Sequence, residues 1–196
     1  MNASTNTIGS NITAIILAGG ASSRMNQPKA LLPWRGQRFI DHVVAQLHDQ
    51  AIIIAISSNQ AELFESLQLP ILADPFSERR GPLAGMLAGL RFSTTPFTLF
   101  VPCDSPLISP QLGARLQRAL TDQAADIAYA TSGGDAHYLF ALLRSDLHSL
   151  LAAYLDRGDY AVRRWFGTLN SIAVDFDDDA RYFLNVNTPA DLQRLE

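Results

Sequence analysis

Short apolar runs alternate with longer amphipathic stretches along the chain, with no repeat or low-complexity tract between them. Most of the short runs are apolar throughout, which is typical of strands buried on both faces of a sheet. They predict strands at Ile12–Leu17, Ala51–Ser57, Ile71–Ala73, Phe97–Val101, Asp126–Ala130, Leu139–Leu143 and Ser171–Asp175. The amphipathic stretches predict helices at Gln37–Gln50, Ala61–Gln68, Pro82–Phe92, Pro110–Thr121, Ser145–Leu155, Ala161–Phe166 and Pro189–Leu195. This alternation indicates βαβ units, so the expected fold class is α/β: a three-layer α/β/α arrangement around an open, mostly parallel, Rossmann-like sheet.

Local turn signals refine this pattern. Ser109-Pro110 and Thr188-Pro189 each combine a capping hydroxyl with a proline in the first turn, so we expect helices to start there. Residues 132–135 (Ser-Gly-Gly-Asp) lie between two apolar runs and have the chemistry of a hairpin turn. We therefore expect an antiparallel hairpin late in the sheet.

The composition is that of an ordinary globular protein. Its 196 residues are 47% hydrophobic and 17% charged, which predicts a single domain over residues 12–196. Residues 1–11 are polar, lack the basic and apolar parts of a secretory signal, and are expected to form a flexible leader. No apolar run approaches the roughly 20 residues of a membrane span. We expect a cytoplasmic protein with no membrane partner.

Charge and cysteine content exclude further classes. A net charge of -4 does not fit the basic stripe of a nucleic-acid-binding protein, so no nucleic-acid partner is expected. Cys103 is the single cysteine, which rules out an internal disulfide and fits a reducing compartment. We interpret it as a buried small apolar side chain and not as a nucleophile. The basic residues comprise 14 arginines and one lysine, Lys29.

A glycine-rich loop follows the first predicted strand. Residues 17–29 read Leu-Ala-Gly-Gly-Ala-Ser-Ser-Arg-Met-Asn-Gln-Pro-Lys. The adjacent Gly19 and Gly20 let the backbone approach an anion closely, and Arg24 and Lys29 supply charge for phosphate oxygens. The loop has neither the Walker A nor the Rossmann glycine spacing. We interpret it as a triphosphate-binding loop, with a plain tight turn as the alternative.

Other chemistry-bearing residues stand at expected strand and helix ends. Asp104 follows an apolar strand, where a carboxylate suits a divalent cation that bridges nucleotide phosphates; a capping role is the alternative. Gly85 lies inside a predicted helix, at a cost of roughly 1 kcal/mol relative to alanine, and so indicates close approach of a ligand or a neighbouring backbone. Asn185 and Asn187 alternate by two and share one face of an extended segment, although asparagine near a helix start is common.

Four segments of the chain form one ordered pattern from Ile15 to the C-terminus. They are the loop Leu-Ala-Gly-Gly-x-Ser-x-Arg-Met at 17–25 with Lys29, Leu31-Leu32-Pro33 and Gly36; Asp74 with Gly81-Pro82-Leu83-Ala84-Gly85; Pro102-Cys103-Asp104-Ser105-Pro106; and Asn185-Val186-Asn187-Thr188-Pro189. The pattern resembles that of nucleotidyltransferases with a glycosyltransferase-A-like fold. Among them it is most similar to the molybdenum cofactor guanylyltransferases of the MobA family.

The resemblance implies a sheet of the nucleotide-diphospho-sugar transferase type and a role for each matching residue. It implies catalytic roles for Arg24, Lys29 and Asp104, with Mg²⁺ held by Asp104. The implied nucleotide-binding residues are Leu17, Ala18, Gly19, Gly20, Lys29, Asp74 and Asp104, and the implied acceptor-binding residues are Gly81, Gly85, His137, Asn185 and Asn187. A turn carboxylate is the alternative for Asp74, and a structural histidine is the alternative for His137.

The implied reaction is Mg²⁺-dependent transfer of GMP from GTP to molybdopterin or Mo-molybdopterin, giving molybdopterin guanine dinucleotide and pyrophosphate. The implied partners are GTP, the pterin acceptor and molybdoenzyme maturation proteins, with the chain a monomer or weak oligomer. Two alternatives stay open: a cytidylyl- or sugar-phosphate nucleotidyltransferase on the same scaffold, and a noncatalytic GTP-binding protein that delivers cofactor. Cytidylyl relatives usually read Leu-Ala-Ala-Gly, so the Leu-Ala-Gly-Gly at 17–20 favours guanylyl transfer.

The chain departs from the family pattern at positions expected to face substrates. Asn26 stands after Met25, where the family usually has glycine. Residues 57–60 (Ser-Ser-Asn-Gln) lack the usual Ala-Asn-Arg, so the base-contacting residue after the second strand is unassigned. Tyr138 and Leu139 stand where proline often follows the histidine. These departures concern the identity of the substrate more than the class of reaction.

Overall fold

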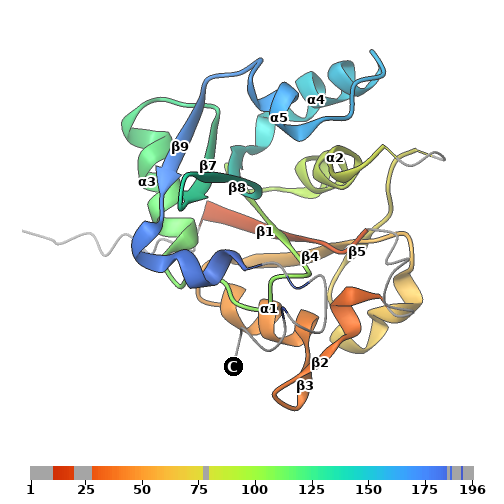
Figure 1. Cartoon of the computed structure of the whole chain (residues 1–196). Coiled ribbons are helices and arrows are strands. Elements are labelled where there is room, and N and C mark those ends of the chain that lie inside the picture. Colours follow the sequence, from red (N-terminus) through yellow and green to blue (C-terminus); the bar gives the residue numbers. More distant parts are fainter. Residues whose placement is uncertain (1–10, 20–27, 77–79, 185, 187–190, 192–196) are drawn as a thin grey trace, which may run out of the picture.

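The computed structural model describes residues 11–19, 28–76, 80–184, 186 and 191 (Figure 1). A seven-stranded sheet forms its centre, in the order β5-β4-β1-β6-β8-β7-β9. The strands are β1 (Ile12–Leu17), β4 (Ile53–Ser57), β5 (Ile71–Leu72), β6 (Phe97–Pro102), β7 (Ile127–Ser132), β8 (Asp135–Arg144) and β9 (Ser171–Asp175). Strand β8 is antiparallel to both of its neighbours, β6 and β7, whereas the other paired strands of this sheet are parallel. The expected open, mostly parallel α/β sheet is confirmed.

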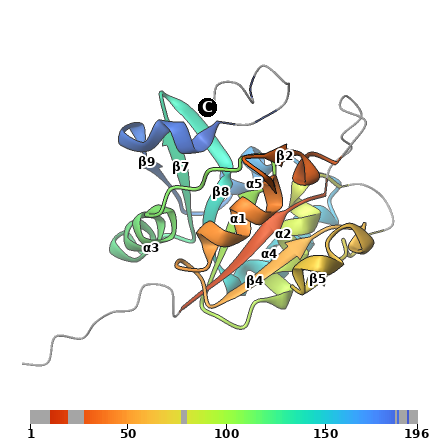
Figure 2. The ribbon, with the colours of Figure 1, turned by 90° about the horizontal axis from the view of Figure 1, so that it is seen from below.

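Helices cover both faces of the sheet, which gives the three layers (Figures 1 and 2). On one face, α2 (Pro82–Phe92), α4 (His148–Leu155) and α5 (Val162–Phe166) share a hydrophobic cluster with the strands. On the other face, α1 (Phe39–Leu47) and α3 (Leu112–Asp122) share a second cluster. Short 3-10 helices complete the chain: η2 (Lys29–Leu31), η3 (Ala61–Leu63), η4 (Glu65–Leu67), η5 (Ser145–Leu147) and η6 (Asp177–Phe183).

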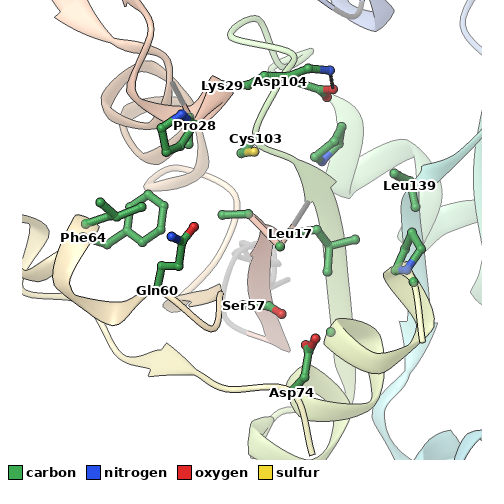
Figure 3. Close-up of a pocket in the computed structure, with 18 residues that line it drawn as sticks. Leu17, Pro28, Lys29, Ser57, Gln60, Phe64, Asp74, Cys103, Asp104 and Leu139 are labelled. Atoms are coloured by element: carbon green, nitrogen blue, oxygen red, sulfur yellow. Dashed lines mark hydrogen bonds and ion pairs between the residues drawn. The ribbon is translucent and has the colours of Figure 1, made fainter. Parts of the chain in front are cut away.

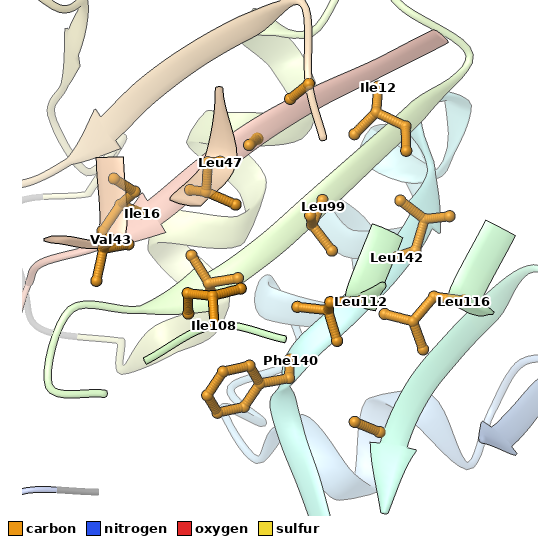
Figure 4. Close-up of a cluster of buried hydrophobic side chains, with 14 of the residues drawn as sticks. Ile12, Ile16, Val43, Leu47, Leu99, Ile108, Leu112, Leu116, Phe140 and Leu142 are labelled. Atoms are coloured by element: carbon orange, nitrogen blue, oxygen red, sulfur yellow. The ribbon is translucent and has the colours of Figure 1, made fainter. Parts of the chain in front are cut away.

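Strand β1 shows why the predicted strands are apolar throughout. Every residue of β1 is buried, and its side chains alternate between the two hydrophobic clusters. Ile12 and Ile16 pack with Val43 of α1 and Leu112 of α3 (Figure 4), whereas Ile15 packs on the side of α2. Full burial of one such side chain contributes about 1.5–3 kcal/mol, so a central strand with two apolar faces anchors both layers.

The predicted hairpin is confirmed. β7 and β8 pair in antiparallel fashion up to Ser132 and Asp135, which flank the turn. Gly133 and Gly134 both have positive φ, +58° and +82°, which glycine adopts without strain and which a two-residue hairpin of the primed type requires. This turn reverses the chain and produces the antiparallel strand β8.

Two predicted helices need correction. α3 begins at Leu112 and not at Pro110, because residues 109–112 form a turn closed by a hydrogen bond from Leu112 N to Ser109 O at 3.0 Å. Ser109 Oγ accepts from Gln111 N at 3.3 Å and donates to Asp179 Oδ2 at 2.7 Å, which ties this turn to η6. The predicted helix Ala61–Gln68 is wrong: the segment forms the separate 3-10 turns η3 and η4, and Gln68 ends them with a left-handed φ of +54°. The tight connection from β4 to β5 thus takes the place of a regular helix.

The start of α1 also differs from the prediction. Gln37 and Arg38 form β3, which pairs with β2 (Pro33–Trp34) in a small antiparallel hairpin. Arg35 and Gly36 turn this hairpin with positive φ values of 49° and 81°. Strands of two residues carry no readable alternation, so the pattern assigned Gln37 to the helix.

Some predictions fall on residues outside the described ones. These are residues 1–10 of the expected leader and nearly all of the expected helix Pro189–Leu195. The single domain over residues 12–196 stays a prediction. Among the described helices, none has the length and apolar character needed to cross a membrane.

Candidate active site

A pocket lies at the carboxyl ends of the parallel strands, beside the start of α2 (Figure 3). This is the edge of an open α/β sheet where ligands bind. It is lined by Leu17, Ala18, Gly19, Pro28, Lys29, Ala30, Ser57, Gln60, Leu63, Phe64, Asp74, Gly81, Pro82, Gly85, Pro102, Cys103, Asp104 and Leu139. Many of the residues predicted from the sequence to bind nucleotide or acceptor are therefore brought together.

Lys29 and Asp104 form an ion pair in this pocket. Lys29 Nζ lies 3.0 Å from Asp104 Oδ2, and the two side chains are 24% and 23% exposed. Lys29 opens η2, and Asp104 lies in the turn that follows β6. The turn is held by backbone hydrogen bonds, from Cys103 N to Leu17 O at 3.2 Å and from Val186 N to Asp104 O at 2.9 Å. An ammonium that suits phosphate oxygens thus sits beside a carboxylate that suits a cation.

The pocket fits a metal that arrives with phosphates. Within the described ranges, no group of three or more His, Cys, Asp or Glu side chains could hold a metal ion. Mg²⁺ keeps several waters and usually takes one or two carboxylates together with substrate phosphates. Asp104 provides such a carboxylate, so the donor set fits a nucleotide-bridging Mg²⁺ better than a metal bound by protein alone.

Asp74 and Asn59 form a second polar group at the pocket. Asp74 N donates to Asn59 Oδ1 at 2.8 Å, and Asn59 Nδ2 donates to Asp74 Oδ2 at 3.1 Å. Burial raises the pKa of Asp74 above its usual value, and the hydrogen bond from Asn59 opposes this shift. Asn59 follows β4, the segment left without an assigned base contact from the sequence. The pair presents a partly desolvated carboxylate in a fixed orientation.

The loop after β1 is partly described. The Ala18 amide donates to Ser57 O at 2.9 Å, so this amide joins β1 to β4 and does not face an anion. Leu17, Ala18 and Gly19 all line the pocket. Gly20 and Arg24 lie outside the described residues, as do Asn185 and Asn187, and their roles stay predictions.

Glycines at the start of α2 line the pocket for different reasons. Gly81 caps α2 with a φ of +66°, a conformation that other residues rarely adopt. A Cβ added at Gly85 would lie 2.5 Å from Ser57 Oγ and 3.1 Å from a methyl carbon of Leu17. Close packing of α2 on the ends of β1 and β4 therefore accounts for Gly85. Acceptor binding by Gly81 and Gly85 stays a prediction.

His137 is not among the described residues that line the pocket. Its Nε2 lies 2.7 Å from Ser132 Oγ, and its ring stacks on Phe183 with centroids 4.8 Å apart. Burial lowers the pKa of His137, and the charge of Asp135 opposes this shift. These are the contacts of a structural histidine, and the predicted acceptor contact is untested.

Cys103 lies partly buried beside Asp104. Burial, assisted by the negative charge of Asp104, raises the pKa of the thiol to about 12. The thiol is therefore protonated near neutral pH, which agrees with the prediction that it is not a nucleophile.

Sequence reasoning missed several lining residues. Ser57 is the last residue of β4, Gln60 lies three positions after it, and Phe64 and Leu139 supply apolar walls. The rule that directs attention to residues after each strand could have found Ser57, Asn59 and Gln60. Phe64 follows a 3-10 turn and carries no comparable signal.

Comparisons with known proteins identify the family of the chain. Residues 14–172 match the family described as the MobA-like NTP transferase domain. A relative from Yersinia pestis (strain Pestoides F), named molybdenum cofactor guanylyltransferase, is 37% identical over 188 residues, which cover 95% of each chain.

Solved structures share the fold. Molybdopterin-guanine dinucleotide biosynthesis protein A from Archaeoglobus fulgidus superposes with a TM-score of 0.78 and 22% identity, over 94% of this chain and 96% of that one. A Mycobacterium tuberculosis protein solved as a complex with manganese gives a TM-score of 0.63 and 18% identity, over 94% and 97% of the two chains. With the family match and the Yersinia relative, these similarities lead to one conclusion: the chain is a nucleotidyltransferase and belongs to the MobA-like NTP transferase family.

Proposed function

We propose that this protein transfers GMP from GTP to the terminal phosphate of molybdopterin or Mo-molybdopterin, with Mg²⁺, releasing pyrophosphate. The observation that carries the proposal is the pairing of Lys29 and Asp104 at the carboxyl ends of β1 and β6, where a triphosphate and its cation would bind. The name of the Yersinia pestis relative supports guanylyl transfer in particular.

The reaction requires alignment and charge neutralisation. An oxygen of the acceptor phosphate forms a bond to the α-phosphorus of GTP, and the bond between that phosphorus and the bridging oxygen to the β-phosphate breaks. The electron pair leaves with pyrophosphate. The acceptor phosphate is already an anion near neutral pH, so no side chain has to act as a general base. Lys29 stabilises the charge that develops on the leaving pyrophosphate.

Asp104 is the residue that would hold Mg²⁺ at the α-phosphate. When bound, the metal supplies charge stabilisation and a template for the reacting phosphates. Gly19, which lines the pocket, would lie beside the phosphates. On the other side of the pocket, Asp74, oriented by Asn59, accepts hydrogen bonds from the nucleoside. Guanine offers two neighbouring N–H donors to such a carboxylate.

A release assay tests the proposal. Purified protein is incubated with each of the four nucleoside triphosphates, with and without molybdopterin and Mg²⁺, and pyrophosphate and dinucleotide are measured. Release that requires GTP, molybdopterin and metal together is the expected result. Preference for CTP, or transfer to a sugar phosphate, would instead indicate the related activities on this scaffold. GTP binding without pyrophosphate release in any combination would indicate a cofactor-delivery protein.

A further inference from the structure

Arg80 is a partly buried cation that has no carboxylate partner among the described residues. None of the ion pairs within the described residues includes it. Its Nη1 donates to Leu155 O at 3.5 Å, the outer limit of a hydrogen bond, and its Nε is buried without a hydrogen-bond partner in the described part of the chain. A desolvated guanidinium that lacks an acceptor is costly, so an anion bound to this guanidinium would offset part of the cost.

Two aromatic rings hold the guanidinium in place. The Arg80 Cζ atom lies 3.9 Å from the ring centroid of Phe76 and 5.6 Å from that of Tyr160. Stacking on ring faces stabilises the charge of an arginine but leaves its in-plane N–H donors unused. Phe76 and Tyr160 therefore fix the position of the cation without neutralising it.

Arg80 is not among the described residues that line the pocket, but it lies next to one that is. Arg80 directly precedes Gly81, which lines the pocket and caps α2. The carbonyl oxygen of Tyr160 would lie 3.8 Å from a Cβ added at Gly81, so Tyr160 stands at the same rim. The amino end of α2, an 11-residue helix, carries partial positive charge and adds to the field of Arg80. The guanidinium of Arg80 and the amino end of α2 thus lie together at this rim, with Tyr160 beside them.

Nucleotidyl transfer brings two anions together, and the pocket contains a cation for the first of them. Lys29, beside Asp104, faces the site of the triphosphate. Arg80 lies next to a different element, at the start of α2. We propose that Arg80 is an acceptor-binding residue whose guanidinium binds the phosphate monoester of the acceptor beside the start of α2. The planar fork of arginine matches two phosphate oxygens, which a lysine does not. This inference rests on the proposed function for the identity of the acceptor.

The test compares Arg80→Gln and Arg80→Lys with a matched control, Arg91→Gln. Arg91 is an exposed arginine in the last turn of the same helix. Binding of molybdopterin is measured by equilibrium dialysis, and binding of Mg-GTP by calorimetry. KM and kcat for both substrates come from the transfer assay, and the melting temperature reports folding.

We expect Arg80→Gln to raise both the Kd and the KM of molybdopterin by about tenfold or more, the size expected for lost hydrogen bonds between charged groups. The Kd of GTP should change less than about twofold, which corresponds to a negligible change in the free energy of GTP binding. Arg80→Lys should lose a smaller part of the affinity, and Arg91→Gln should match the wild type.

Other outcomes overturn the inference. Unchanged molybdopterin affinity in a folded Arg80→Gln protein would make Arg80 a structural residue, and equal loss of GTP affinity would make it a nucleotide contact. If Arg80→Gln does not fold, Arg80→Lys decides, since wild-type acceptor affinity with lysine would refute a guanidinium contact. Dialysis needs no turnover. If the wild type forms no dinucleotide, the proposed function fails. Equilibrium dialysis of molybdopterin still measures whether Arg80 binds this anion.

Discussion

Lys29 Nζ and Asp104 Oδ2 lie 3.0 Å apart although the two residues are separated by 75 positions in the chain. The ion pair joins the start of η2 to the turn after β6 and cancels the charge of both side chains. Under the proposed function each side chain has another partner, a phosphate for Lys29 and a cation for Asp104. The pair therefore has to open when nucleotide and metal bind.

Replacement of Asp104 by alanine is expected to abolish turnover in a protein that still folds. The side chain is partly exposed and its removal leaves no buried cavity, but the metal loses its carboxylate. We expect kcat to fall at least about 100-fold, a loss typical of a major electrostatic contribution to the transition state. Pyrophosphate release and the melting temperature are measured together. Activity within a few-fold of wild type would remove Asp104 from the mechanism.

The affinity of the nucleotide-free protein for a metal ion should depend on Lys29, the ion-pair partner of Asp104. Because the Lys29 ammonium occupies the carboxylate, we expect Mn²⁺ to bind the nucleotide-free protein weakly. Lys29→Met should strengthen that binding several-fold, whereas it should weaken binding of Mn-GTP. Electron paramagnetic resonance of free Mn²⁺ measures both, and Lys29→Arg, which keeps the cation, serves as control. Equal Mn²⁺ affinity in wild type and Lys29→Met would contradict the competition.

Lys29 is the single lysine of the chain, so amine acylation reports on one side chain and the terminal amine. We expect GTP to protect Lys29 from the reagent because the ammonium would contact the triphosphate. Mass spectrometry of the labelled peptide measures the protection, with the terminal amine as internal reference. Equal labelling of Lys29 with and without GTP would place this lysine on an ordinary solvated surface.

Affinity for GTP should fall on acidification as Asp74 takes up a proton. Burial raises the pKa of Asp74, so the ionised form that accepts nucleoside N–H groups is lost at a higher pH than for an ordinary aspartate. Asn59→Ala removes the hydrogen bond that lowers this pKa and should shift the loss to still higher pH. Calorimetric titrations across pH test this. Asp74→Asn cannot ionise at this position, so its pH profile reports the protonation of GTP alone. If the GTP affinity of the wild type changes with pH in the same way as that of Asp74→Asn, Asp74 does not bind the nucleoside as a carboxylate.

Packing at Gly85 gives a prediction that is independent of substrate. Gly85→Ala should destabilise the fold by about 1–3 kcal/mol, the range for overpacking, because the new Cβ would meet Ser57 Oγ at 2.5 Å. Adding Ser57→Ala removes that atom and should recover part of the loss. The matched control is Gly89→Ala, which meets Ile15 and Phe100 instead. Urea unfolding measures all of these variants. Equal rescue of Gly85→Ala and Gly89→Ala by Ser57→Ala would contradict the assigned contact.

The regular elements followed from local patterns. β1, β9 and α2 have the predicted bounds, because runs buried on two faces and a proline at a helix start leave a strong trace in the sequence. The turn at Gly133 and Gly134 followed from backbone chemistry. Local signals place the start of α3 too early, because Ser109 lies in a turn before the helix and its hydroxyl also bonds Asp179, 70 positions further along the chain.

Residue types after β1 and β6 were sufficient to nominate Lys29 and Asp104, since parallel strands deliver their carboxyl ends to one edge of the sheet, whereas Asp74 was nominated by the family resemblance. The sequence by itself therefore determined the fold class and several of the residues that line the pocket. The partners of these residues were decided by tertiary structure alone. The contact of Asn59 with Asp74, the ion pair of Lys29 with Asp104, and the stacking of Arg80 on Tyr160 each join segments that lie far apart in the chain. Side-chain contacts of this kind depend on how the layers pack, and hydrophobic periodicity contains no record of them.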